Sequence, residues 1–231
     1  MMTSILYNCV RFTQSLIAQP CVLCGARTRG GLLCAPCEAD LPRLPVERCP
    51  RCALPSPGGH LCGACLKRPP AFDRAAAVFS YGFPLDALIR HCKYGGAQEL
   101  AAWFAASLAA ELKEHPRPDL IVPMPLHPAR LRQRGFNQAL EIARRLADRL
   151  DIPCRHACRR QRDTPSQAGL DLKARRRNLR DAFVCDESLA DKRVALLDDV
   201  MTSGSSLDEL ARTARRAGAA DISVWVVART L

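Results

Sequence analysis

Apolar and polar positions follow two patterns over the last two-thirds of the chain. Short unbroken apolar runs, which are typical of buried strands, alternate with stretches whose apolar residues recur every three or four positions, as in helices. The predicted strands are residues 75–81, 119–122, 194–197 and 222–228. The predicted helices are residues 85–92, 99–113, 137–150 and 207–217. Apolar strands separated by helices predict an α/β fold with a parallel sheet flanked by helices.

The first third of the chain follows neither pattern. Residues 3–17 form a weak amphipathic helical pattern, for which packing on the body and membrane contact are both open readings. Residues 42–70 are rich in Pro and Gly, which indicates a boundary. We therefore expect an amphipathic N-terminal helix within 1–20, a small module over 21–70 and the α/β domain over 71–231.

Cysteine spacing gives the small module its chemistry. Eight of the 13 cysteines form four Cys-x-x-Cys pairs, and nine residues separate the first pair from the second and the third pair from the fourth. Two such pairs supply four thiolates to one ion, so the spacing predicts two structural zinc sites. Disulfides and iron–sulfur clusters are the alternatives. The predicted ligands are Cys21, Cys24, Cys34, Cys37, Cys49, Cys52, Cys62 and Cys65.

The order of pairing follows from the repeat. Sequential pairing, first with second and third with fourth, fits the repeated unit better than a crossed arrangement. His60 lies two residues before Cys62 and is interpreted as a loop residue, since four cysteines already complete the site. The five remaining cysteines, Cys154 and Cys158 among them, are interpreted as buried thiols. We expect the module to fold only with its metal.

Charge is concentrated in one stretch of the 231 residues. The formal net charge is +11, and residues 128–180 alone hold 15 basic and 5 acidic side chains. Such a stretch is either a solvated face or the border of a site for an anion. No window has the roughly 18 uncharged apolar residues of a spanning helix, and the first 20 residues lack a secretory pattern. A cytoplasmic protein is therefore expected.

The strongest chemical signal lies at residues 194–206, where a buried strand leads into two acids, a hydroxyl-rich loop and a helix. Ligands of open α/β sheets bind at the carboxyl ends of strands, and a helix that begins there points N–H groups at a phosphate. An ordinary capped turn is the alternative, but it does not account for adjacent acids. We predict a ribose 5-phosphate pocket. Its residues are Asp198, Asp199, Thr202, Ser203, Gly204, Ser205 and Ser206.

The same segment resembles the phosphoribosyl pyrophosphate motif of type I phosphoribosyltransferases. The motifs at 132–138, 162–167 and 227–230, together with the four cysteine pairs, resemble the ComF family of competence-associated proteins across essentially the whole chain. The resemblance implies a type I phosphoribosyltransferase fold after a double zinc ribbon. It also implies binding of phosphoribosyl pyrophosphate with Mg²⁺ and a link to DNA uptake in natural transformation.

The resemblance also implies roles for single residues. Asp198 and Asp199 hold the ribose hydroxyls, and residues 202–206 hold the 5-phosphate. Arg134 lines the pyrophosphate side, and residues 162–178 form a mobile loop that carries Arg162 and Arg175. Lys93 faces either an anion or solvent, His127 is either near the site or in an exposed turn, and Asn137 is a candidate helix cap. No residue stands out as a general base, so the catalytic residue and the acceptor stay unknown.

Three functions are compatible with these patterns. The first is a phosphoribosyltransferase of unknown acceptor, which would release pyrophosphate. The second is a sensor or accessory factor that handles single-stranded DNA with its basic stretch and ribbons. Binding that weakens as salt is raised would favour this second function. Only 5% of residues are aromatic, however, so few side chains are available to stack on bases. The third is an adaptor whose ribbons dock a partner such as a DNA-uptake helicase.

Overall fold

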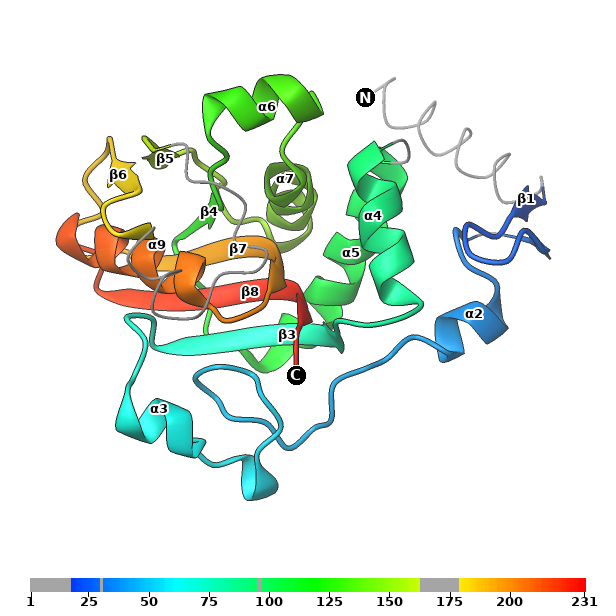
Figure 1. Cartoon of the computed structure of the whole chain (residues 1–231), viewed down its shortest axis with the longest axis horizontal. Helices are drawn as coiled ribbons and strands as arrows, with labels where there is room; N and C mark the ends of the chain where they lie inside the picture. Colours follow the sequence, from blue (N-terminus) through cyan, green and yellow to red (C-terminus); the bar gives the residue numbers. More distant parts are fainter. Residues whose placement is uncertain (1–17, 30, 95–96, 163–178) are drawn as a thin grey trace.

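A four-stranded parallel sheet lies at the centre of the computed structural model, which describes residues 18–29, 31–94, 97–162 and 179–231 (Figure 1). The strand order is β3 (Arg74–Ser80), β8 (Asp221–Arg229), β7 (Arg193–Met201) and β4 (Leu120–Pro123). All three strand pairs are parallel. β7 and β8 are the inner strands, and apart from Val200 their apolar residues are almost fully buried.

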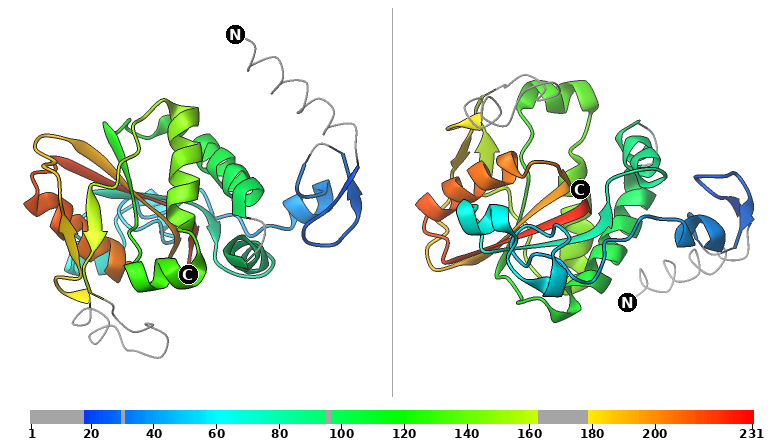
Figure 2. Two further views of the ribbon diagram at one scale, coloured as in Figure 1. Left: turned by 90° about the horizontal axis from the view of Figure 1, so that it is seen from above. Right: turned by 60° about the horizontal axis from the view of Figure 1, so that its bottom comes forward.

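Helices cover both faces of the sheet (Figure 2). After α4 (Leu85–Tyr94), helices α5 (Ala97–Glu111) and α7 (Gln138–Leu150) pack on one face, and α9 (Ser205–Arg216) packs on the other. The connection from β3 to β4 runs across the sheet in one direction, and the connection from β7 to β8 runs in the other. Right-handed connections therefore place α5 and α9 on opposite faces. The predicted fold class, a helix-flanked parallel sheet preceded by a four-cysteine module, is confirmed.

Each strand and helix predicted for residues 75–228 is present, but β7 is longer than expected. The apolar run suggests a strand over 194–197, whereas hydrogen-bonded pairing with β8 continues through Val200 and Met201. The apolar pattern stops at Leu197 because Asp198 and Asp199 follow it, but the backbone of β7 continues to pair with β8. Asp198 and Asp199 therefore lie inside the strand rather than after it.

The sequence analysis missed a short helix, α6 (Pro128–Arg134). Pro128 occupies the first turn, the imidazole of His127 accepts a hydrogen bond from the Ala129 amide, and Gly135 ends the helix with a φ of 79°. Proline at the start and glycine just past the end are typical helix boundaries. His127 is therefore the N-cap of α6, and its nearness to the site stays a prediction.

A second correction concerns the cysteines outside the ribbons. An antiparallel pair of strands, β5 (Cys158–Arg160) and β6 (Phe183–Cys185), lies beside the main sheet, and its facing residues Cys158 and Cys185 form a disulfide. The interpretation of Cys158 as a simple buried thiol is therefore wrong. The two cysteines are 27 residues apart and follow no recognisable spacing, so only the strand pairing brings them together.

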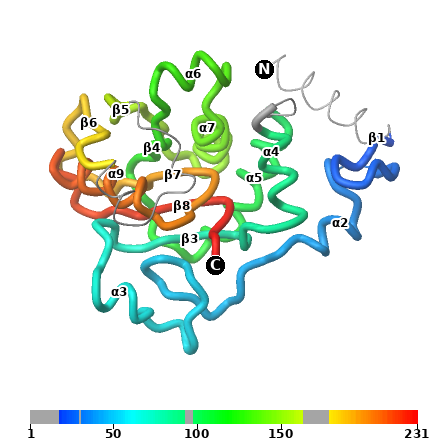
Figure 3. Tube along the Cα trace, in the orientation of Figure 1, coloured from blue at the N-terminus to red at the C-terminus, as the bar shows by residue number. Residues whose placement is uncertain are grey.

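The cysteine-rich module consists of two ribbons (Figure 3). The first ribbon, residues 18–41, contains β1 (Gln19–Pro20), β2 (Arg27–Thr28) and α2 (Ala35–Ala39). The second ribbon, residues 47–67, contains the 3-10 helix η1 (Pro57–Gly59) and α3 (Gly63–Lys67). The first ribbon lies at one end of the molecule, and the second lies below β3 (Figure 3). The division of the chain at residue 70 stays a prediction.

The chain between the ribbons covers the outer edge of β3. The Ser80 amide donates to the Pro42 carbonyl at 2.7 Å, and the Leu44 amide donates to the Val78 carbonyl at 3.1 Å. Farther along, the Ala75 amide donates to the Pro50 carbonyl at 3.0 Å. The edge strand of the sheet thus has hydrogen-bond partners on its outer side as well.

Within the described ranges, none of the helices combines the length and apolar character needed to cross a bilayer. The amphipathic pattern at residues 3–17 lies outside the described residues. A further short helix, η2 (Leu112–Glu114), extends α5.

Replacing Gly218 by alanine is expected to destabilise the fold by about 2–3 kcal/mol. Gly218 follows α9 with a φ of +99°, and an added Cβ would lie 2.9 Å from the Ala190 Cα. Urea unfolding of the zinc-loaded protein measures the loss. Gly82→Ala is the matched control, because its Cβ meets nothing within 4 Å. Equal stability of the two variants would contradict this prediction.

Candidate functional site

The predicted ribose-phosphate pocket lies at the carboxyl end of β7, an inner strand. Residues Val194 to Leu197 are fully buried, whereas Asp198 and Asp199 are partly exposed. The carboxyl ends of β4 and β8 lie on either side, because both strands are parallel to β7. This edge of the sheet is where open α/β folds bind their ligands.

Backbone N–H groups hold both carboxylates. Asp198 Oδ1 accepts a hydrogen bond from the Asp199 amide at 2.9 Å, and Asp199 Oδ1 accepts one from the Val200 amide at 2.8 Å. Each carboxylate is fixed close to its own backbone, and carboxylate oxygens are acceptors that suit hydroxyl donors.

The segment after β7 turns sharply into α9. Gly204 is the N-cap of α9, with a φ of 76° that favours glycine, and it has no side chain with which to cap the helix. Ser205 is buried, and its hydroxyl lies 2.9 Å from that of Ser203. Thr202 is exposed. The 202–206 segment thus combines hydroxyl groups with the N-terminus of a 12-residue helix, an arrangement that favours an anion.

The residues predicted to surround the pocket differ in how the structure places them. Arg134 is exposed at the end of α6, which follows β4 and so begins at the same edge of the sheet. Arg162 is exposed and donates to the Arg180 carbonyl at 2.9 Å. Lys93 lies near the end of α4. Arg175 and most of the predicted mobile loop lie outside the described residues.

Asn137 has a structural role that the sequence allowed. Its side-chain oxygen accepts a hydrogen bond from the Leu140 amide at 3.4 Å, which caps α7. Its side-chain nitrogen donates to the Met124 carbonyl at 3.0 Å and ties the start of α7 to the end of β4. Asn137 therefore caps α7 and also connects the start of that helix to the edge of the sheet.

The sequence analysis gave no role to Arg229, the last residue of β8. Arg229 is 6% exposed and donates to four backbone carbonyls. Nε donates to Cys52 at 3.0 Å, and Nη1 donates to Met201 at 3.0 Å, to Thr230 at 2.6 Å and also to Thr202. Its place in the motif at 227–230 was the only available signal. A buried arginine thus touches both a ribbon cysteine and the candidate pocket.

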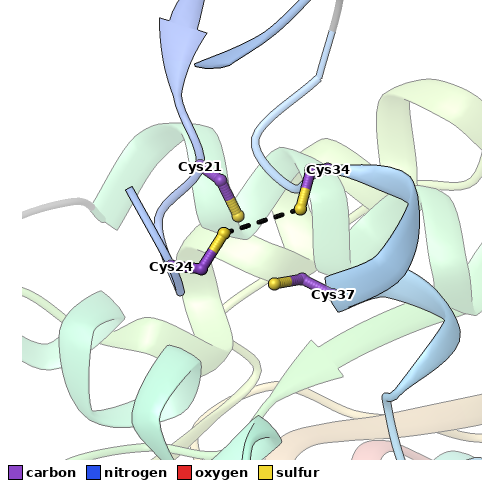
Figure 4. Close-up of side chains that lie close together, drawn as sticks. All are labelled: Cys21, Cys24, Cys34 and Cys37. Atoms are coloured by element: carbon purple, nitrogen blue, oxygen red, sulfur yellow. Dashed lines mark hydrogen bonds between the residues drawn. The ribbon is translucent and has the colours of Figure 1, made fainter. Parts of the chain in front are cut away.

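The four cysteine pairs gather in sequential order into two groups. The sulfur atoms within each group lie within 4.8 Å of one another, and Figure 4 shows the side chains of Cys21, Cys24, Cys34 and Cys37 converging. The second group consists of Cys49, Cys52, Cys62 and Cys65. His60 belongs to neither group. Four converging sulfur atoms with no other ligand fit the donor set of a structural zinc site.

Backbone hydrogen bonds prepare the first cysteine of each group for a metal. Burial raises the pKa of the Cys21 thiol, but N–H donors from Cys24, Cys34 and Leu23 outweigh it and lower that pKa to about 6. Burial likewise raises the pKa of Cys49, and donors from Cys62, Cys52 and Arg51 lower it to about 7. The thiolate is the form that binds a metal, so these backbone donors favour the ligating state of Cys21 and Cys49. Neighbouring thiols, by contrast, raise the pKa of Cys37, and burial together with neighbouring thiols raises the pKa of Cys65.

Comparison with known proteins identifies the chain. A family model described as a double zinc ribbon domain matches residues 12–66. The chain is 35% identical over 207 residues to DNA utilization protein YhgH of Escherichia coli (strain K12), covering 86% of this chain and 91% of that protein. It is 34% identical over 209 residues to competence protein F of Haemophilus influenzae, covering 85% and 90% respectively.

The fold and ribbons define an α/β protein with a double zinc ribbon. On the identity and coverage of these relatives, the chain belongs to the ComF family. It is also 24% identical over 227 residues to competence protein ComFC of Streptococcus pneumoniae, covering 90% of this chain and 99% of that protein.

Two solved structures match part of the chain. Glutamine phosphoribosylpyrophosphate amidotransferase from B. subtilis matches 56% of this chain and 27% of its own, with 16% identity and a TM-score of 0.39. Purine phosphoribosyltransferase from Pyrococcus horikoshii matches 56% of this chain and 81% of its own, with 22% identity and a TM-score of 0.35. At these TM-scores the two likenesses support no statement about function.

Proposed function

We propose that the chain binds phosphoribosyl pyrophosphate with Mg²⁺ at the carboxyl end of β7. One observation carries the proposal: an inner strand delivers two adjacent carboxylates, Asp198 and Asp199, directly into the hydroxyl-rich start of α9. The carboxylates accept hydrogen bonds from the ribose hydroxyls. The 202–206 segment holds the 5-phosphate with its hydroxyl and N–H groups.

The remaining groups serve the pyrophosphate. Arg134 comes from the segment after β4, beside β7, and its guanidinium is suited to bidentate contact with phosphate oxygens. Carboxylate oxygens are hard donors, so Asp198 and Asp199 fit a site where Mg²⁺ is held largely by the ligand's own phosphates. When bound, Mg²⁺ would offset negative charge on the pyrophosphate.

The reaction that such a pocket supports is phosphoribosyl transfer. The bond between the anomeric carbon and the pyrophosphate oxygen breaks, pyrophosphate leaves with the bonding electrons, and a nucleophile bonds to the anomeric carbon. The protein's part is to hold the sugar by its hydroxyls and 5-phosphate and to place cationic groups where the leaving group gains charge. The acceptor is an unidentified nucleophile.

Calorimetric titration of the zinc-loaded protein with phosphoribosyl pyrophosphate and Mg²⁺ tests the proposal. We expect saturable binding that is tighter than binding of ribose 5-phosphate or pyrophosphate alone, because the pocket holds both ends of the ligand. Pyrophosphate release in the presence of candidate acceptors then tests transfer. Absence of binding by folded protein would reject the donor pocket and leave an adaptor built on the same fold.

The names of the relatives support a role in the use or uptake of DNA. In that role we propose single-stranded DNA as a partner of the basic side chains of α6, of which Arg132 and Arg134 are exposed. Contacts of this kind weaken steeply as salt is raised. Affinity for single-stranded DNA that is independent of salt, or absent, would remove α6 from the proposal. A DNA-uptake helicase is the protein partner proposed for the ribbons.

A further inference from the structure

We propose that Arg229 is a positioning residue that couples the second zinc site to the 202–206 segment, so that the metal-bound second ribbon sets the affinity of the pocket. The inference deepens the proposed function and rests on it for its ligand. It starts from the four carbonyl contacts of one buried guanidinium, which join Cys52 to Met201 and Thr202.

On the pocket side, Arg229 fixes the orientation of two successive peptide groups. The carbonyls of Met201 and Thr202 both accept hydrogen bonds from Nη1. In a trans peptide the carbonyl and the following N–H point in opposite directions, so the N–H groups of Thr202 and Ser203 point away from Arg229. The guanidinium therefore helps to set where the segment presents its donors.

On the ribbon side, Arg229 holds the knuckle formed by residues 49–53. The Cys52 carbonyl accepts from Nε, and the sulfur of the same residue belongs to the second cysteine group. Ala53 is 1% exposed with a φ of 59°, and its amide donates to the Cys49 carbonyl at 2.9 Å. A knuckle that depends on its metal for shape thus supplies an acceptor to Arg229.

A buried cation needs such acceptors. The Arg229 side chain is almost fully buried, so its N–H groups depend on the carbonyls of Cys52, Met201 and Thr202 rather than on water. An arginine deprived of partners in this position would leave an uncompensated charge among buried groups, which is costly. The ribbon carbonyl and the pocket carbonyls therefore depend on one another through the same side chain.

The first ribbon packs apolar residues such as Cys21 and Leu33 against the main core, but in the part of the chain that the structure describes no hydrogen bond from its knuckles reaches the α/β domain. Among the described residues, the backbone hydrogen bonds of its two knuckles join residues between Cys21 and Leu41. In the second ribbon, by contrast, Pro50 and Cys52 accept from Ala75 and Arg229 of the α/β domain. The two ribbons share the same ligand chemistry, so they form an internal comparison in one molecule.

The test uses the full-length, zinc-loaded chain with Arg229→Met and the milder Arg229→Lys. Arg74→Met is the matched control, since Arg74 lies at the amino end of β3 and binds Asp221 at 2.9 Å, away from the pocket. Measured are zinc content, thermal stability, hydrogen exchange of residues 200–208 and 226–231, and affinity for phosphoribosyl pyrophosphate with Mg²⁺. We expect the Arg229 variants to exchange faster in both segments and to bind at least about tenfold more weakly.

The Arg74→Met variant is expected to lose stability while keeping its affinity and the exchange pattern at the pocket. If the Arg229 and Arg74 variants behave alike in affinity and in exchange, the coupling is refuted. If the wild-type chain does not bind the ligand but the Arg229 variants still loosen residues 200–208, the proposed function is wrong and the coupling stands.

A second experiment leaves Arg229 intact, so it tests the coupling even if the Arg229 variants do not fold. Cys62→Ser in the second site and Cys24→Ser in the first remove equivalent ligands. We expect faster exchange of residues 200–208 in Cys62→Ser than in Cys24→Ser, because Arg229 contacts the 49–53 knuckle of the second ribbon, whose zinc site Cys62 helps to form. Equal exchange of that segment in the two variants overturns the coupling.

Discussion

The Asp198→Asn/Asp199→Asn double variant is expected to lose at least about 100-fold in affinity for phosphoribosyl pyrophosphate, or roughly 3 kcal/mol. Hydrogen bonds from ribose hydroxyls to a carboxylate are charge-assisted, and an amide replaces them with weaker, partly mismatched contacts. Asparagine keeps a side-chain oxygen that accepts from the Asp199 and Val200 amides, as the carboxylates do. The fold should therefore persist while binding is lost.

Calorimetry measures the affinity, and thermal unfolding verifies that the variant is folded. Asp148→Asn/Asp151→Asn is the matched control, because it removes the same charge from two exposed residues at the far end of α7. This control should bind like the wild type. Unaltered binding by the Asp198/Asp199 variant would show that the ligand lies elsewhere.

Removing the second zinc site is expected to have the largest effect on stability. Cys49 is fully buried and its knuckle lies against β3, so Cys49→Ser should lower the free energy of unfolding by about 3–5 kcal/mol. Cys24→Ser in the exposed part of the first ribbon should cost less, because no knuckle hydrogen bond there reaches the sheet. Urea unfolding with zinc analysis of each variant measures the difference.

The stoichiometry provides a check on this comparison. Each variant should retain one zinc ion at its intact site, as expected of two independent four-cysteine groups. A Cys49→Ser chain that is as stable as the Cys24→Ser chain would contradict the view that the second ribbon supports the sheet.

Local patterns in the sequence were sufficient to predict the strands and helices whose own residues show a clear apolar period. The apolar runs of β7 and β8 and the apolar face of α7 predict their elements because burial imposes those periods. The cysteine spacing likewise predicts which sulfur atoms meet, because each knuckle is a local turn. The pairing of β7 with β8 beyond Leu197 depends on a neighbouring strand, which no local pattern records.

The features that were missed depend on contacts between distant parts of the chain. Cys158 meets Cys185 only because β5 pairs with β6. In the sequence, Arg229 is one more basic residue. In the fold it is buried between Cys52 and Met201, which lie 177 and 28 positions earlier in the chain. Its role follows from its burial and from the carbonyls around it, which only the tertiary structure defines. The roles of the pocket residues stay predictions.

The covered edge of β3 has a consequence for the behaviour of the protein when metal is scarce. Three backbone groups of β3 that would otherwise be open to another chain already have hydrogen-bond partners. These partners are the Pro42 carbonyl, the Leu44 amide and the Pro50 carbonyl. An exposed strand edge is a template for intermolecular strand addition and aggregation. Because the segments that cover it belong to or adjoin the ribbons, we expect loss of zinc to open this edge to pairing with another copy of the chain.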